Sequence, residues 1–177
     1  ISAFRNGQDV HSMTAAKIFG ISPEDVTADQ RRIAKTANFG ILYGISAFGL
    51  SQRLHIGRAE AKKIIEDYFS NFPAISSYIE DTLASAREFG YVETLFGRRR
   101  YLPDINSRNA TVRALAERTA INAPIQGTSA DIIKLAMVKV SQRLRDEGYK
   151  ARLILQVHDE LVVECPLEEA DAAAALL

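Results

Sequence analysis

Four side chains that suit a ligand with one charged end and one flat end recur at every fourth position between residues 31 and 43. They are Arg31, Lys35, Phe39 and Tyr43. Residues four apart lie on one face of an α-helix, so the spacing predicts a stripe of two cations followed by two aromatic rings. A nucleoside triphosphate has a matching shape. The alternative is a solvated charged face next to two ordinary core aromatics.

An acidic group lies between two apolar segments near the end of the chain. His158, Asp159 and Glu160 separate residues 153–157 from residues 161–165, a pattern that predicts a β-hairpin with buried arms and an acidic tip. Rigid strands would hold the Asp159 carboxylate at a fixed point, which suits a hard divalent cation with oxygen ligands. An ordinary polar turn is the alternative for His158. The histidines and the cysteine are too scattered to predict a zinc site.

Three long hydrogen-bonding side chains, Arg118, Asn122 and Gln126, are also spaced four apart. On one helix face they could reach base edges or sugars. We expect Pro124 to end the helix before Gln126, because proline lacks the N–H that the helix interior needs. A polar surface face is the simpler alternative for these three residues.

Three consecutive arginines, residues 98–100, fall on a predicted turn. Such a run adds salt-dependent affinity when a phosphate backbone is nearby. The alternative is a solvated turn without a partner.

The helix that would carry the first stripe is well marked at both ends. Thr27 and Gln30 fit a capping box at its start, and Gly44 suits a left-handed stop after its last turn. We therefore expect a helix over residues 28–43. Gly40 is unusual inside it, since an interior glycine costs about 1 kcal/mol relative to alanine. Either a flat ligand approaches the backbone there, or the helix packs closely on a neighbour.

Helical periodicity and caps predict most of the remaining chain to be helical, which gives an α+β class that is predominantly helical. The expected helices cover residues 9–19, 46–55, 58–71, 74–89, 108–122 and 128–147, with a helix start at 22–25 and a further helical pattern over 168–177. A small hairpin is expected around residues 91–102.

Bulk composition narrows the class of protein. The 177 residues are 47% hydrophobic and 25% charged, which is typical of globular proteins. Basic and acidic residues number 22 each, so any attraction for phosphate must come from local clusters. A single cysteine excludes an internal disulfide, and no apolar stretch predicts a membrane span. The chain begins without methionine and stops within a helical pattern, so we expect a fragment of a larger protein.

Four segments together resemble one known family. Residues 31–44, RRIAKTANFGILYG, resemble the O helix in the fingers of family A DNA polymerases, and residues 156–164, QVHDELVVE, resemble motif C of the palm. Residues 90–105, GYVETLFGRRRYLPDI, and residues 117–134, ERTAINAPIQGTSADIIK, are similar to the same family in the same order. The resemblance covers nearly the whole chain.

The resemblance implies a polymerase that transfers deoxynucleotides to a primer 3′-OH, directed by a template. It implies fingers helices over residues 1–112 and a partial palm with an antiparallel β-hairpin over residues 113–177. The partners would be primer-template DNA and dNTPs, the cofactor two Mg²⁺ ions, and the parent a monomer in the cytoplasm, associated with the nucleoid. The other strands of the hairpin's sheet would be mostly missing, so its apolar faces would be exposed.

The resemblance also implies roles in nucleotide binding. Arg31 and Lys35 would hold the triphosphate of the incoming dNTP, and Lys35 would also protonate the pyrophosphate leaving group. His11 matches a histidine that approaches the same phosphates. Phe39 would pack on the base and sugar, and a phenylalanine here implies rejection of dideoxynucleotides. Tyr43 would lie beside the templating position.

Further roles concern the primer and the metal. The residues that would contact the primer terminus and the minor-groove edge are Arg118, Asn122, Gln126 and His158. Asp159 would ligate the catalytic magnesium, and Glu160 would contribute more weakly. The family's motif A, with the other metal-binding aspartate, would lie before Ile1, so we expect this chain alone to be inactive.

Two other classes remain open at this point. A non-catalytic nucleic-acid-binding module would explain the cationic stripe and the arginine run, but it leaves the acidic tip unexplained. A purely structural helical domain would explain neither the stripe at residues 31–43 nor the acidic tip at residues 158–160.

Overall fold

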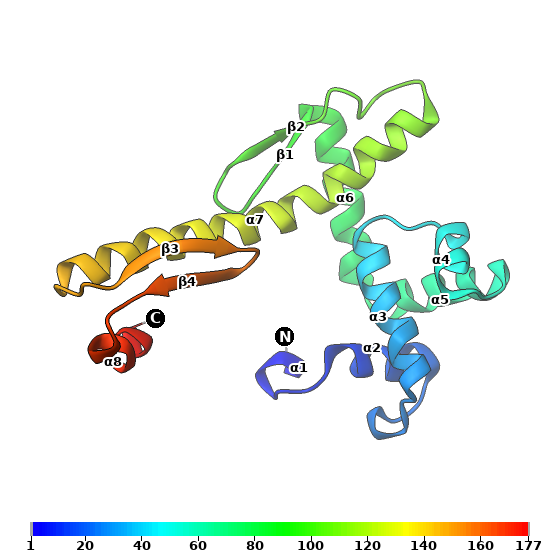
Figure 1. Cartoon of the computed structure of the whole chain (residues 1–177). Coiled ribbons are helices and arrows are strands. Elements are labelled where there is room, and N and C mark those ends of the chain that lie inside the picture. The colour runs from blue at the N-terminus through cyan, green and yellow to red at the C-terminus, as the bar shows by residue number, and fades with distance from the viewer. Residues whose placement is uncertain (1, 177) are drawn as a thin grey trace. The chain divides into compact units, whose positions relative to one another are not determined.

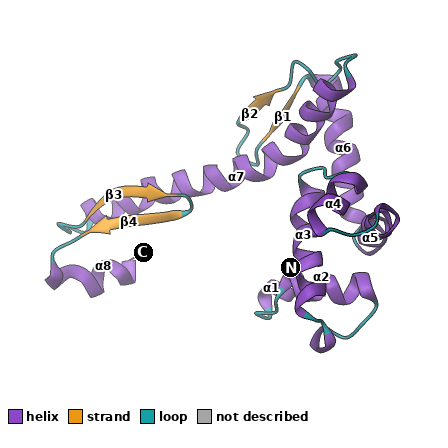
Figure 2. Cartoon of the chain, turned by 45° about the vertical axis from the view of Figure 1, so that its right-hand side comes forward, coloured by secondary structure: helices purple, strands orange, loops and turns teal. Residues whose placement is uncertain are grey.

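The computed structural model describes residues 2–176 and consists mostly of helices, with two short antiparallel hairpins (Figures 1 and 2). This confirms the expected α+β class. The elements are α1 (Ser2–Arg5), α2 (Val10–Phe19), the 3₁₀ turn η1 (Pro23–Asp25), α3 (Ala28–Leu42), α4 (Ala47–Leu54), α5 (Arg58–Asn71), α6 (Pro73–Phe89), β1 (Tyr91–Glu93), β2 (Arg99–Tyr101), α7 (Ala110–Asp146), β3 (Arg152–Val157), β4 (Glu160–Glu164), η2 (Leu167–Glu169) and α8 (Ala170–Leu176).

The chain forms two compact units. The first unit comprises Ile1–Val92 and Arg100–Ala123, and the second comprises Glu93–Arg99 and Pro124–Leu177. These bounds describe packing and not function. The division into fingers over residues 1–112 and palm over residues 113–177 stays a prediction.

Local capping explains where α3 begins and ends. The Gln30 amide donates to Thr27 Oγ1 at 3.2 Å, and the Thr27 amide donates to Gln30 Oε1 at 2.9 Å, so the expected capping box is present. Gly44 follows the helix with φ 68°, the left-handed conformation that glycine adopts without strain. Both signals are local in sequence, so the sequence alone predicts the two ends of this helix.

One hydrophobic core of the first unit lies among α2, α3, α4 and α5. Its buried members are Ile18, Ala37, Ile41, Leu50, Leu54, Ala61, Ile64 and Tyr68. Gly40 belongs to this packing, since a Cβ built on it would lie 2.9 Å from Cγ2 of Ile45. Close packing therefore accounts for the interior glycine, and the neighbour is the segment just after α3.

The expected helix end at Pro124 is wrong, because α7 continues through it from Ala110 to Asp146. Proline removes one helix hydrogen bond and crowds the preceding turn. A donor from another helix reaches that turn: the Tyr78 hydroxyl of α6 donates to the Ile121 carbonyl at 2.9 Å. Burial raises the pKa of Tyr78, so its hydroxyl keeps the proton that it donates.

The hairpin of β3 and β4 has the expected antiparallel pairing but not the expected buried arms. It is a two-stranded sheet whose apolar side chains are largely exposed, Ile154 by 56% and Leu155 by 55%. Two strands alone cannot cover their own faces. The register shifts between Leu153 and Leu155, so Ile154 forms a bulge. The exposure agrees with the expectation that other strands complete this sheet.

The Tyr78 hydrogen bond gives a stability prediction. Tyr78→Phe removes the donor and leaves the Ile121 carbonyl without it, so the free energy of unfolding should fall by about 1 kcal/mol. Urea denaturation followed by circular dichroism measures this. Tyr101→Phe is the matched control, because Tyr101 is 66% exposed. Equal effects of the two substitutions would contradict the stabilising role of Tyr78.

Candidate functional site

The predicted stripe on α3 lies on the exposed face of that helix. Lys35 is exposed, and Phe39 and Tyr43 are 48% and 42% exposed. The opposite face is buried through Ala37 and Ile41. The alternative in which both aromatics belong to the core is therefore wrong, since a helix buries one face and leaves the other to solvent or a ligand.

Arg31, at the cationic end of the stripe, is held by the start of α2. Asp9 accepts from the Ser12 amide at 2.7 Å and so caps α2. The same carboxylate accepts from Arg31 Nη2 at 2.7 Å and from Arg31 Nε at 3.2 Å. The Arg31 guanidinium, helped by the Ser12 amide, holds the pKa of Asp9 well below its usual range. A two-point contact of this kind fixes the direction of the guanidinium.

His11 of α2 contacts α3 beside the stripe. Its ring lies 5.7 Å from the Phe39 ring, and its Nδ1 lies 3.1 Å from Nδ2 of Asn38. Burial lowers the pKa of His11, and the charges of Arg31 and Lys35 lower it further, while Asp9 opposes them. The first turn of α2 thus brings a carboxylate and an imidazole beside the α3 stripe.

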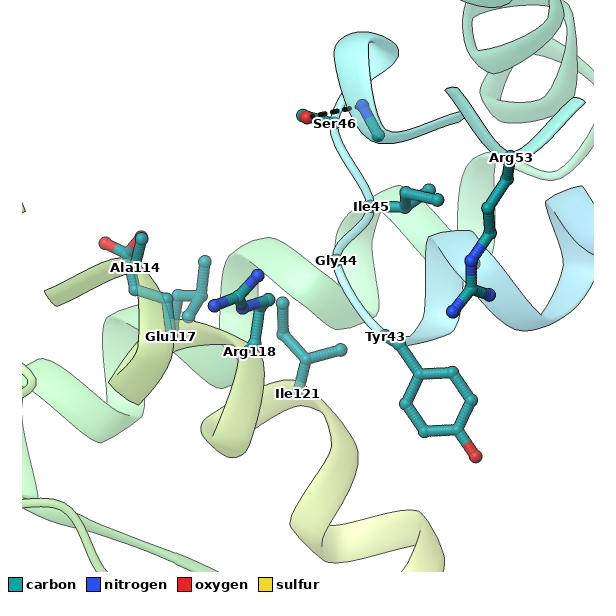
Figure 3. Close-up of a pocket in the computed structure, with 12 residues that line it drawn as sticks. Tyr43, Gly44, Ile45, Ser46, Arg53, Ala114, Glu117, Arg118 and Ile121 are labelled. Atoms are coloured by element: carbon teal, nitrogen blue, oxygen red, sulfur yellow. Dashed lines mark hydrogen bonds between the residues drawn. The ribbon is translucent and has the colours of Figure 1, made fainter. Parts of the chain in front are cut away.

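A cavity of about 680 Å³ adjoins the aromatic end of the stripe (Figure 3). Tyr43, Arg53 of α4 and Arg118 of α7 line it together, and Figure 3 shows these residues around the turn at Gly44. A Cβ on Gly44 would lie 2.9 Å from Cγ of Arg118. The structure therefore brings Arg118 to the end of the stripe, although the two signals are 75 residues apart in sequence.

The acidic tip is a two-residue turn of His158 and Asp159, with Val157 paired to Glu160. His158 has φ 54°, and its carbonyl accepts from Gln156 Nε2 at 2.8 Å. Asp159 and Glu160 are exposed, and their oxygens suit Mg²⁺ chemically. Among residues 2–176, however, no three histidine, cysteine or acidic side chains cluster to hold a metal. The tip alone therefore offers an incomplete ligand set.

The remaining predicted residues lie on α7 and at the turn after β1. Asn122 is half-buried in the first unit, and Gln126 is exposed in the second. In the arginine run, Arg98 Nε donates to Asp131 Oδ1 at 2.8 Å, and Arg99 Nε donates to Glu93 Oε1 at 2.7 Å. Asp131 is buried, so a solvated turn without a partner is the wrong description of Arg98.

Asp9 and Asn38 take part in the contact between α2 and α3, but neither was predicted from the sequence. Asp9 has the signal of a helix cap before Val10, which says nothing of Arg31. Asn38 has no local signal, because its contacts come from the packing of α2 on α3. Both residues are visible only once tertiary contacts are known.

Comparisons with known proteins give a consistent family. The family model for DNA polymerase family A matches residues 1–177. DNA polymerase I of Geobacillus stearothermophilus is 56% identical over 177 residues, which cover 100% of this chain and 20% of that protein. DNA polymerase I of Pseudomonas aeruginosa is 57% identical over 164 residues, 93% of this chain and 18% of that protein. The chain thus spans about a fifth of the length of these relatives.

A solved structure is also similar. It is the POL domain of Pol1 from M. smegmatis in complex with DNA primer-template and dNTP, with a TM-score of 0.91 and 46% identity over 99% of this chain and 31% of that chain. Within the described residues, none of the helices combines the length and the hydrophobicity that crossing a bilayer requires.

The Asp9–Arg31 pair predicts a pH-dependent stability. Because folding lowers the pKa of Asp9, its ionised form stabilises the fold above the carboxyl pKa of the unfolded chain, about 4, and this contribution is lost as the pH falls further. Asp9→Asn keeps a helix cap but loses the ion pair. The stability difference between the two proteins, measured by urea denaturation, should be present at pH 7 and shrink below about pH 4.

The control for this prediction is Asp29→Asn. Asp29 pairs with Arg32 at 3.3 Å, but its side chain is 83% exposed. Solvent screens such a pair, so this substitution should change the unfolding free energy little at either pH. A difference for Asp9→Asn that stayed constant from pH 7 to pH 3 would contradict the ion pair.

Proposed function

The chain belongs to DNA polymerase family A, and from this membership we propose that it forms the nucleotide-binding part of a DNA-directed DNA polymerase. The observation that carries the proposal is the exposed α3 stripe, with cations at one end and aromatic rings at the other. Such a surface matches a dNTP, which is anionic at the triphosphate and flat at the base. The reaction would be transfer of a deoxynucleotide to a primer 3′-OH.

The α3 residues would bind and orient the nucleotide. Arg31 and Lys35 neutralise the triphosphate, and Lys35 gives a proton to the departing pyrophosphate. His11 donates a hydrogen bond to the same phosphates. Phe39 packs on the base and sugar, and Tyr43 shapes the position of the templating base. Phosphoryl transfer depends mainly on in-line positioning and charge neutralisation, so these contacts would supply most of the catalysis made by this region.

The residues on α7 and the hairpin would bind the primer end. Arg118, Asn122, Gln126 and His158 have donors and acceptors that reach the minor-groove edge, where correct base pairs share acceptor positions. Arg118 lies at the aromatic end of the stripe, which supports a contact near the templating base. Interactions formed only with a correct pair would favour correct insertion.

The hairpin tip would supply part of a magnesium site. Asp159 is the proposed ligand, and Glu160 is a weaker contributor. Bound Mg²⁺ would lower the pKa of the primer hydroxyl and neutralise charge on the phosphates. Two carboxylates do not complete a site for two ions, so we propose that the other ligands come from the rest of the polymerase. The 177 residues alone would then bind nucleotide weakly and catalyse no extension.

A chimera tests this function. In DNA polymerase I of Geobacillus stearothermophilus, the matching 177-residue segment is replaced by this chain. The chimera should extend a primer with dNTPs and Mg²⁺, while the isolated chain should not. Asp159→Asn should reduce the chimera's kcat by at least about 100-fold. A folded chimera that binds primer-template DNA but never extends it would contradict the proposal.

Two arginine variants of the chimera distinguish the polymerase from the second candidate function, a non-catalytic nucleic-acid-binding module. If Arg31 holds the triphosphate, Arg31→Ala should lower kcat/KM for dTTP by about 10- to 100-fold and leave the Kd for DNA nearly unchanged. Arg32→Ala is the matched control, because Arg32 pairs with Asp29 instead. Equal losses of nucleotide use and DNA binding in Arg31→Ala would favour the binding module.

Phe39 gives a prediction about substrate choice. Its ring has no polar group to compensate for a missing 3′-OH, so we expect the chimera to reject dideoxynucleotides. Phe39→Tyr should raise the ratio of dideoxy to deoxy incorporation by about tenfold, the equivalent of one hydrogen bond. Single-nucleotide insertion kinetics measure the ratio. Phe48→Tyr, on α4, is the control, and an unchanged ratio in Phe39→Tyr would contradict the role of Phe39.

A further inference from the structure

We propose that Asn38 is a positioning residue that holds His11 as a neutral imidazole with its hydrogen on Nε2. The inference starts from hydrogen bonds between α2 and α3. It rests on the proposed function only where it assigns the Nε2 hydrogen to a phosphate oxygen.

The first step is the direction of the Thr14 hydroxyl. Thr14 Oγ1 donates to the Val10 carbonyl at 2.9 Å within α2. A hydroxyl has one hydrogen, and a carbonyl can only accept. Thr14 Oγ1 must therefore act as an acceptor toward Asn38, whose Nδ2 lies 3.2 Å away. If the Asn38 amide were turned over, its oxygen would face Thr14 Oγ1. The two oxygens would repel each other unless the Thr14 hydroxyl broke its hydrogen bond to the Val10 carbonyl.

The second step uses the orientation of the Asn38 amide to assign the protonated nitrogen of His11. The amide nitrogen of Asn38 has two hydrogens and accepts none. One hydrogen goes to Thr14 Oγ1, and the other points to His11 Nδ1 at 3.1 Å. Nδ1 must then be the unprotonated ring nitrogen. In a neutral imidazole the hydrogen is consequently on Nε2.

The third step concerns charge. Protonating His11 would place an N–H at Nδ1 against the N–H of Asn38, so the amide disfavours the imidazolium. The charged groups around His11 are Arg31 and Lys35 from α3, which also disfavour it, and Asp9 at the start of α2, which favours it. Partial burial acts against the cation as well. The neutral ring is the net result.

A neutral donor has a consequence for nucleotide binding. The Nε2 hydrogen can bind a phosphate oxygen without adding a third positive charge beside Arg31 and Lys35. Burial and the charges of Arg31 and Lys35 lower the pKa of His11, so the protonation of this donor would change less near neutral pH than that of an exposed histidine. The triphosphate would be oriented by His11, while the two cations supply the attraction.

The experiment reads the tautomer directly. Two-bond ¹H–¹⁵N correlations of the ¹⁵N-labelled chain distinguish a protonated from an unprotonated ring nitrogen, and His55 and His158 serve as internal references. His11 should show Nε2 protonated and a pKa below that of an exposed histidine. Nδ1 protonated in the unmodified chain, or an ordinary pKa, would overturn the inference.

Three variants test the hydrogen-bond chain itself. Asn38→Asp replaces the donor with an acceptor of the same shape, so Nδ1 should become protonated and the His11 pKa should rise by about one unit or more. Thr14→Val frees the amide to turn over, so the preference for Nε2 should weaken. Thr14→Ser keeps the hydroxyl and should preserve the tautomer. A His11 tautomer and pKa that are unmoved in both Asn38→Asp and Thr14→Val would overturn the proposal.

The polymerase chimera separates this inference from the proposed function. The KM for dTTP should depend less on pH between 6 and 8 with Asn38 than with Asn38→Asp, in which His11 should titrate at a higher pH. If the tautomer changes as predicted but KM does not respond, the inference stands and the phosphate contact of His11 fails. If the tautomer is wrong, the inference fails whatever the chimera does.

Discussion

The contact between the first turn of α2 and the exposed face of α3 is the interaction on which the candidate site depends. Helical periodicity alone places Arg31, Lys35, Phe39 and Tyr43 on one face, but it does not fix where their charges point. Asp9 does so for Arg31, because one carboxylate both caps α2 and accepts two hydrogen bonds from the guanidinium. The same contact sets the surroundings of His11. The proposed nucleotide-binding surface is thus a product of tertiary packing.

The Asp9–Arg31 pair also shapes how an anion would bind. The chain has no net charge, so attraction for a triphosphate must be local. Without ligand, Asp9 neutralises Arg31, but both side chains are over 40% exposed, so solvent screens part of their attraction. A triphosphate with several charges can therefore compete for Arg31 at small cost. Asp9 would keep the guanidinium in position until the nucleotide arrives.

Local signals made much of the fold predictable. The capping box at Thr27, the left-handed glycines and the bounds of α5 all follow from neighbours in sequence. The path of α7 through Pro124 was not predictable, because the disturbed turn is contacted by Tyr78, which lies 43 residues before its hydrogen-bond partner Ile121. The stripe and the acidic tip were visible as patterns. The contacts of Asn38, the packing of Arg118 near Tyr43 and the exposure of the hairpin arms were not predictable, because they depend on how segments distant in sequence pack.

The most direct test of the central claim is to map nucleotide binding on the chain by amide ¹H–¹⁵N chemical shifts. Titration with dTTP should shift signals from residues 9–11 and along residues 31–43. Thymidine, which lacks the phosphates, should leave the signals of residues 9–11, 31 and 35 unmoved. This result would place the triphosphate at the α2–α3 contact. Shifts by dTTP confined to other regions, such as the arginines at 98–100, would contradict a binding role for the α3 stripe.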